Sequence, residues 1–193
     1  MDQTAAKPER AKTEPASQAP PAFTPEPKDF DNLVREQSER VTRLCYRLLG
    51  WRADVEDVVQ DVFYAALRAW PRFRGASAPA TWLTRIAVNA CRGHLRKRWL
   101  RLRYFTAAEE TPEAVQEAGR NEPLLAAERF EQVRAAVRRL PAKYREAVVL
   151  RYLEGMPVEQ VSDVLGLSRG AMDVRLNRAR KMLHEDLAEY LEG

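Results

Sequence analysis

The sequence predicts an all-α protein with two small helical domains joined by a flexible linker. Apolar residues recur every three or four positions along most of the chain, which is the period of an amphipathic helix. No segment shows the alternation of a half-buried strand. Residues 104–123 lose the helical period, turn acidic and contain two prolines and one glycine. That composition is typical of an interdomain linker, and 193 residues suffice for two small domains.

The overall composition indicates a soluble globular protein with a bias towards an anionic partner. Hydrophobic residues make up 45% of the chain and charged residues 31%, with a net charge of +4 and a pI of about 9.2. The positive charge is concentrated in a run from Arg92 to Arg103 without acidic residues, and an acidic stretch follows between residues 109 and 117. The charge pattern is therefore local. A basic run of this kind is found on solvated faces, on membrane-surface patches and along nucleic acid.

The cysteines and histidines do not predict a metal site, a cofactor or a disulfide framework. Cys45 and Cys91 each lie inside an apolar helical pattern without CxxC spacing, so we expect buried thiols. The only histidines are His94 and His184. No apolar run reaches the length of a membrane span, and the N-terminus lacks a signal-peptide core. We expect a cytoplasmic protein.

The chain begins with a tail over residues 1–28 that is rich in Pro, Ala, Glu and Lys. This segment has too few large apolar residues to offset its ordering entropy, so we expect it to be disordered. The first domain is expected over residues 29–103. It opens with a helix at Asp29–Leu49, which Gly50 ends.

A second helix, Val55–Trp70, has the clearest amphipathic pattern in the first half of the chain. Its apolar face comprises Val55, Val58, Val59, Val62, Phe63, Ala66, Leu67 and Trp70. The reverse face is acidic and amide-bearing, and it comprises Asp57, Gln60, Asp61 and Tyr64. This face is either solvated or docks a basic helix of another protein. Pro71 stops the helix.

The segment after Pro71 combines a loop with a basic helix. Residues 72–81 contain Gly75 and Pro79 between small residues, and a helix is expected over Trp82–Leu95 that continues into the basic run. A loop of small residues and arginine beside a basic helix suits unstacked single-stranded nucleic acid. Trp82 lies at helical spacing, which is also typical of a core residue.

The second domain is expected over residues 124–193 and contains four helices. The first, Leu124–Leu140, places Phe130, Val133, Val137 and Leu140 on one face, and the second spans Lys143–Leu153. Two further helices follow between Val158 and Leu183. The apolar residues of the last helix are Met172, Leu176, Ala179 and Leu183.

The last two helices have the pattern of a helix-turn-helix. Gly166 stands where a helix end needs a left-handed residue, and Ser168 can cap the following helix through its hydroxyl. The polar face of that helix collects Gly170, Val174, Asn177, Arg178 and Lys181, with arginines at its edges. A helix packed on one side and basic on the other is how this motif enters a DNA major groove. A helical hairpin with a solvated basic face remains the alternative.

Three blocks of the sequence together resemble the bacterial sigma-70 family of transcription initiation factors. They are ADVEDVVQDVFYAALRAW (Ala53–Trp70), FRGASAPATWLTRIAVNACRGHLRKR (Phe73–Arg98) and LPAKYREAVVLRYLEGMPVEQVSDVLGLSRGAMDVRLNRARKML (Leu140–Leu183). Their order and spacing look most like the small extracytoplasmic-function (ECF) group, which keeps only the second and fourth sigma domains. The resemblance covers nearly everything from Leu33 to Leu187.

The resemblance implies a non-catalytic sigma factor that binds RNA polymerase core and selects promoters. In this family the polar face of the second helix docks the clamp helices of the largest polymerase subunit, a role that would fall on Asp57, Gln60 and Asp61. The second domain would contact the flap of the second-largest subunit. The family also implies an anti-sigma protein that covers the polymerase-binding surfaces while the linker lets the domains close together.

The resemblance also implies two DNA-binding surfaces. The loop and helix from Phe73 to Arg98 look like the part that melts the −10 element and reads it as a single strand. The matching residues are Arg74, Ser77, Thr81, Trp82 and Asn89, with Arg92, Arg96, Lys97 and Arg98 holding phosphates. The helix-turn-helix resembles the reader of the −35 duplex. In it Arg169, Val174, Asn177 and Arg178 would face bases, Arg175, Arg180 and Lys181 would contact phosphate, and Ser168 begins the surface.

Two positions depart from the family pattern. Where the family commonly has Gly-Thr-Val-Lys, this chain has Gly-Ala-Met-Asp, so Asp173 replaces a cation. An acidic side chain there can accept from cytosine N4 or repel phosphate, so the −35 preference cannot be copied from relatives. Gly93 stands where the family usually has an acidic residue, which leaves the −10 base contacts open.

A stand-alone helix-turn-helix regulator with an N-terminal sensor domain is the alternative function. It predicts duplex binding without polymerase, but a sensor needs neither the acidic helix face nor the basic loop and helix. An enzyme is poorly supported, because the sequence contains no nucleophile–base pair, metal cluster or glycine-rich motif.

Overall fold

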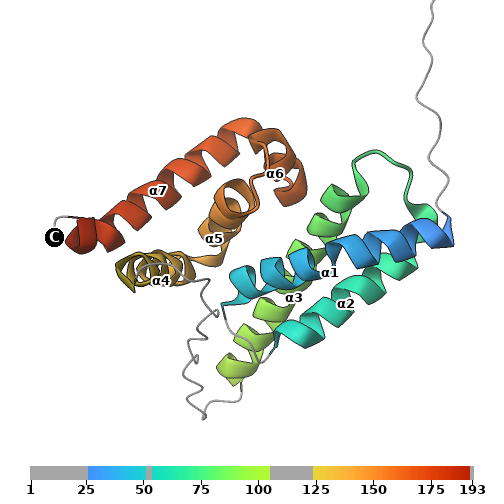
Figure 1. Cartoon of the computed structure of the whole chain (residues 1–193), viewed down its shortest axis with the longest axis horizontal. Coiled ribbons are helices and arrows are strands. Elements are labelled where there is room, and N and C mark those ends of the chain that lie inside the picture. The colour runs from blue at the N-terminus through green and yellow to red at the C-terminus, as the bar shows by residue number, and fades with distance from the viewer. Residues whose placement is uncertain (1–25, 51–53, 105–123, 192–193) are drawn as a thin grey trace, which may run out of the picture.

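The computed structural model describes residues 26–50, 54–104 and 124–191 (Figure 1). All regular structure in these ranges is helical, as predicted. The helices are α1 (Pro27–Leu49), α2 (Val55–Ala69), α3 (Pro79–Tyr104), α4 (Leu124–Arg139), α5 (Ala142–Val148), α6 (Val158–Leu165) and α7 (Arg169–Leu191). A 3₁₀ turn at Trp70–Arg72 follows α2, and a π-helical turn at Val149–Leu153 follows α5.

The first three helices pack against one another as an N-terminal unit. Val58 and Val62 of α2 are buried against Leu44 of α1 and Leu83 of α3 in a core from which water is excluded. Burying apolar area in this way supplies most of the driving force for folding. The amphipathic pattern therefore predicted the buried centre of α2, at Val58 and Val62, whereas Val59 and Phe63 of the same predicted face are only partly buried.

Four aromatic rings close the end of this unit where α2 meets the loop to α3. Trp70 lies 5.6 Å from Phe30, 5.4 Å from Phe73 and 5.7 Å from Trp82, measured between ring centroids. The Trp70 indole Nε1 also donates to the Glu26 carbonyl at 3.0 Å. Aromatic packing of this kind gives a rigid base for the loop that leaves it.

The remaining four helices form a C-terminal unit that ends in the predicted helix-turn-helix. Gly166 has a φ of 69°, and the Ser168 hydroxyl accepts from the Ala171 backbone N–H at 3.3 Å. Both the glycine turn and the serine cap are thus confirmed. Met172, Leu176 and Ala179 of α7 are buried, which leaves the opposite face of α7 in solvent.

The two units lie side by side (Figure 1), and their buried apolar residues form one cluster. The α3 helix packs on α6, and α1 contacts α5 and the π-helical turn. The core residues Cys45 and Leu49 of α1 belong to the same cluster as Leu150 and Val161. The sequence predicted two units but not this direct contact between them.

Several boundaries and faces differ from the sequence-based predictions. α1 begins at Pro27, because proline is well suited to the first helical turn, and α3 begins at Pro79 for the same reason. Leu67, Phe130 and Val133 belong to predicted apolar faces but are exposed. The helical period shows that a face is apolar, and only the tertiary arrangement determines how far a neighbouring helix covers it. α4 packs through its C-terminal half, at Ala136 and Val137.

The predicted tail, apart from residues 26–28, and the predicted linker, apart from Tyr104, lie outside the described residues. No described helix has the length and apolar content that a membrane crossing requires. Within the described ranges, no group of three or more His, Cys, Asp or Glu side chains is arranged to hold a metal ion.

Candidate nucleic-acid and protein interfaces

The polar face of α2 lies in solvent beside an apolar groove. Asp57, Gln60 and Asp61 are all exposed, and they lie opposite the buried valines of the same helix. The groove runs between α1 and α2, and its lining includes Phe30, Val34, Val59, Phe63 and Leu67. The exposed Leu67 is therefore part of a concave surface. An acidic rim beside an apolar groove suits a helix that carries both basic and apolar side chains.

The loop between α2 and α3 projects from the aromatic base. The Arg74 side chain is exposed, and its Nη1 donates to the Pro71 carbonyl at 3.4 Å. Gly75 has a φ of 72°, a conformation that glycine adopts without strain. Ser77 is half-buried on the same loop. The loop thus places an arginine, a hydroxyl and open backbone at one end of α3.

Trp82 packs against the aromatic base of the loop but is only partly buried. Its ring lies 5.1 Å from Phe73 and 5.7 Å from Trp70, so one part of the indole belongs to the core. The residue as a whole is only partly buried, as is the neighbouring Thr81. A partly exposed aromatic residue can provide a surface on which a base stacks.

The polar residues of α3 form one stripe along the helix. Positions separated by four, four, three and four residues face the same direction on an α-helix, and this stripe comprises Thr81, Arg85, Asn89, Arg92 and Arg96. Arg85 and Asn89 are exposed, as is Arg96 near the end of the stripe. Arg85 is not among the residues predicted from the sequence, although its spacing from Thr81 and Asn89 was a sufficient signal.

Among the predicted phosphate-binding residues, Arg92 and Arg98 contact carboxylates, and Lys97 lies away from the stripe. Arg92 forms a bidentate pair with Glu146 of α5, at 2.9 Å from Nε and 2.7 Å from Nη2. These bonds raise the pKa of the Arg92 guanidinium. Arg98 points towards Asp54, with 3.5 Å between its Nη1 and the carboxylate. Lys97 is exposed on α3 but away from the stripe.

A second contact of Asp54 ties α3 to the start of α2. The His94 Nε2 lies 3.0 Å from the same carboxylate oxygen of Asp54 that Arg98 approaches. Asp54 stands at the N-cap position of α2, but its side chain forms no cap hydrogen bond. Its carboxylate instead contacts α3, because the His94 and Arg98 side chains reach it from that helix.

The exposed face of α7 carries the residues predicted to read the −35 duplex. Val174, Asn177, Arg178 and Lys181 are exposed, and half of the Val174 surface is open, at 51%. Arg169 pairs with Glu159 of α6, and Arg180 donates to the Asn177 side chain. Asp173, which replaces the usual cation, is also exposed on α7.

Two residues of α5 reach this face and were missed by the sequence analysis. The Lys143 ammonium lies 4.8 Å from the centre of the Tyr144 ring, and the Lys143 carbonyl lies 3.5 Å from Arg175 Nη1. A hydrogen bond with Arg178, followed by the charge of Lys143, lowers the pKa of the Tyr144 hydroxyl. Because α5 is distant in sequence from α7, no local pattern could reveal this contact.

Comparisons with known proteins agree on both units. The family model for sigma-70 region 2 matches residues 33–101, and the model for sigma-70 region 4 matches residues 130–183. The ECF RNA polymerase sigma-E factor of Escherichia coli K12 is 34% identical over 163 residues, which cover 81% of this chain and 85% of that protein.

Two further proteins extend the comparison. The ECF RNA polymerase sigma factor SigE of Mycolicibacterium smegmatis is 32% identical over 162 residues, and this chain spans 62% of its length. Among solved structures, the sigma factor RpoE of Bartonella quintana, crystallised with the anti-sigma factor NepR, shares the fold. It has a TM-score of 0.69 and 24% identity over 83% of this chain and 98% of that one.

Proposed function

Because this chain belongs to the sigma-70 family and is an alternative sigma factor of its ECF group, we propose a division of its surface into three binding sites. The acidic face of α2 docks polymerase core. The loop after α2 and the stripe on α3 hold the −10 element, and α7 reads the −35 element. The observation that carries this proposal is the separation of three chemically distinct faces, each backed by a buried core.

The polymerase contact rests on Asp57, Gln60 and Asp61. Their exposure on one helix face, beside the apolar groove, suits the clamp helices of the largest polymerase subunit. The C-terminal unit would contact the flap of the second-largest subunit. Electrostatic complementarity of this kind accelerates docking and fixes its orientation more than it adds affinity.

The −10 contact rests on the loop and on the α3 stripe. Arg74 and the α3 arginines would hold phosphates, and the partly exposed Trp82 would receive an unstacked base beside Thr81 and Asn89. We add Arg85 to this set because it lies between Thr81 and Asn89. Binding energy gained from the flipped strand would offset the cost of unpairing.

The −35 contact rests on the exposed face of α7 in a major groove. Arg169, Val174, Asn177 and Arg178 would face bases, while Arg175, Arg180 and Lys181 would contact phosphates, with Ser168 capping the helix at the groove. Base contacts specify sequence and phosphate contacts set position. Asp173 would favour cytosine at the base pair that it meets, because a carboxylate accepts from the N4 amino group.

Sigma factors are not enzymes, and this chain would contribute specificity to polymerase without bond chemistry of its own. Its work would take place in the cytoplasm, where polymerase and promoter DNA are found. An anti-sigma protein is a further proposed partner, supported by the B. quintana neighbour that was crystallised with one. The stand-alone regulator is not favoured, because the family matches include both units.

Binding to purified polymerase core tests the first of the three sites. The double variant Asp57→Lys/Asp61→Lys should lose most of its affinity for polymerase core, measured by biolayer interferometry. Its circular dichroism spectrum should remain that of a helical protein. Glu36→Lys/Glu39→Lys is the matched control, since it makes the same charge change at two exposed positions of α1. Equal affinity of both variants for core would overturn the assignment of the α2 face.

A further inference from the structure

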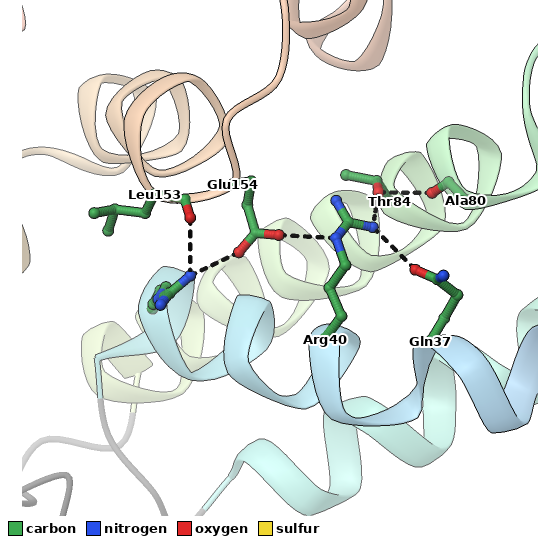
Figure 2. A network of polar contacts seen from close by, with 7 residues as sticks. Gln37, Arg40, Ala80, Thr84, Leu153 and Glu154 are labelled. Carbon is green, nitrogen blue, oxygen red and sulfur yellow. Dashed lines mark hydrogen bonds and ion pairs between the residues drawn. The ribbon is translucent and has the colours of Figure 1, made fainter. Parts of the chain in front are cut away.

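Glu154 of the C-terminal unit is held by two arginines of the N-terminal unit, as Figure 2 shows. Its carboxylate lies 3.0 Å from Arg40 Nε and 2.8 Å from Arg47 Nη1, and the glutamate side chain is only 4% exposed. Arg47 also donates to the Leu153 carbonyl at 3.3 Å. The carboxylate is therefore nearly dehydrated by contacts from the other unit.

Arg40 is itself anchored within the N-terminal unit (Figure 2). Its Nη1 donates to the hydroxyl of Thr84 on α3 at 3.1 Å and to Gln37 on α1 at 3.3 Å. Thr84 in turn donates to the Ala80 carbonyl at 2.7 Å. The guanidinium is thus fixed by residues of both α1 and α3 in a position that meets Glu154.

Glu146 makes a second contact of the same kind. Its side chain is 9% exposed and accepts both hydrogen bonds from Arg92 on α3. A nearly buried carboxylate is tolerated only when it is paired and hydrogen-bonded. Both glutamates would regain water if the two units separated. The closed arrangement is therefore held by these two polar contacts in addition to the shared apolar core.

The position of Arg92 links closure to DNA binding. Arg92 lies on the α3 stripe that the proposed function assigns to the −10 strand, and a guanidinium fork binds a carboxylate or a phosphate with the same bidentate geometry. While Glu146 occupies that fork, a DNA phosphate cannot. Asp57, Gln60 and Asp61 remain exposed in the same structure, so polymerase core can dock before the units open.

We propose that the closed structure is a self-inhibited state in which Glu146 and Glu154 latch the C-terminal unit onto the N-terminal unit, with Glu146 occupying a phosphate site. The latch belongs to the chain itself and needs no second protein. The inhibitory consequence rests on the proposed function, whereas the latch does not. Opening must break both arginine–glutamate contacts before the α3 stripe can hold DNA along its full length.

Small-angle X-ray scattering of the full chain tests the latch directly. Glu146→Gln/Glu154→Gln keeps the side-chain shapes but removes both negative charges, and it should give a larger radius of gyration than the wild type. Glu39→Gln is the matched control, because it removes an exposed ion pair within α1, and it should scatter as the wild type does. Indistinguishable scattering from all three proteins would overturn the latch. Glu154→Gln alone, which should expand the chain less, serves if the double variant fails to fold.

Binding of a labelled single-stranded oligonucleotide tests the inhibitory role. Without polymerase, Glu146→Gln/Glu154→Gln should bind roughly tenfold more tightly than the wild type, the effect of freeing a charge-assisted contact. Adding Arg92→Ala to this variant should abolish the gain. An expanded variant with unchanged affinity would refute self-inhibition but leave the latch standing. If the wild type failed to support transcription while scattering still showed opening, the proposed function alone would fail.

Discussion

At the scale of single residues, the structure shows side chains that position others. Interaction with Arg178 of α7 lowers the pKa of the Tyr144 hydroxyl of α5, so an aromatic residue of one helix lies close to a proposed base reader of another. The period of α7 predicted Arg178 as a site residue. Tyr144 was not predicted, because a contact between residues more than 30 positions apart does not affect the hydrophobic period of either helix.

The substitution Tyr144→Phe tests this positioning. It removes the hydroxyl but keeps the ring, so Arg178 should lose its fixed orientation. We expect discrimination between the best −35 duplex and its variant at the Arg178 base pair to fall by roughly tenfold, the value of one good bidentate contact. Fluorescence anisotropy with the two duplexes measures this. A uniform loss on both duplexes would instead indicate that Tyr144 serves stability.

The two cysteines give a second prediction at this scale. A hydrogen bond with Cys45, followed by burial, raises the pKa of the Cys91 thiol far above its usual range. The reactive thiolate is therefore absent near neutral pH, and both side chains are buried. Ellman's reagent should find no reactive thiol in the native protein and both thiols after unfolding in guanidinium. Rapid native reaction would contradict the buried assignment.

At the scale of helices, the sequence predicted periodic features well and interhelical features poorly. The faces of α2 and α7 and the glycine turn at Gly166 followed from spacing alone. The exposure of Leu67 and Phe130 did not, because an apolar period carries no information on what covers it. The pairing of Arg92 with Glu146 could not be predicted from the sequence either, because the basic run by itself indicates only that its partner is anionic.

Gly166 and Gly93 differ in backbone conformation, so replacing each with alanine should have opposite effects on stability. Gly166 has a φ of 69° and open space around it, so Gly166→Ala should cost roughly 1 kcal/mol of unfolding free energy through backbone strain alone. Gly93 lies inside α3, also with open space, and Gly93→Ala should gain roughly 0.5–1 kcal/mol through helix propensity. Urea denaturation measures both. Equal effects of the two substitutions would contradict this account.

At the scale of the whole molecule, the shared core and the latch predict cooperative unfolding. All four tryptophans lie between residues 51 and 99, before the helices of the C-terminal unit. Tryptophan fluorescence therefore reports the N-terminal unit, whereas circular dichroism reports both units. The two signals should give coincident urea transitions for the wild type. They should separate for Glu146→Gln/Glu154→Gln, because the units then unfold independently. Separate transitions in the wild type would show that the units are not coupled.

Run-off transcription shows whether three faces of this chain direct polymerase to promoters. Polymerase core, the chain and a pool of promoter fragments should yield discrete transcripts that share −10 and −35 elements upstream of their starts. These transcripts should vanish with Asp57→Lys/Asp61→Lys and persist with Glu36→Lys/Glu39→Lys. Transcripts no different from those of core alone, from a folded chain, would contradict the account.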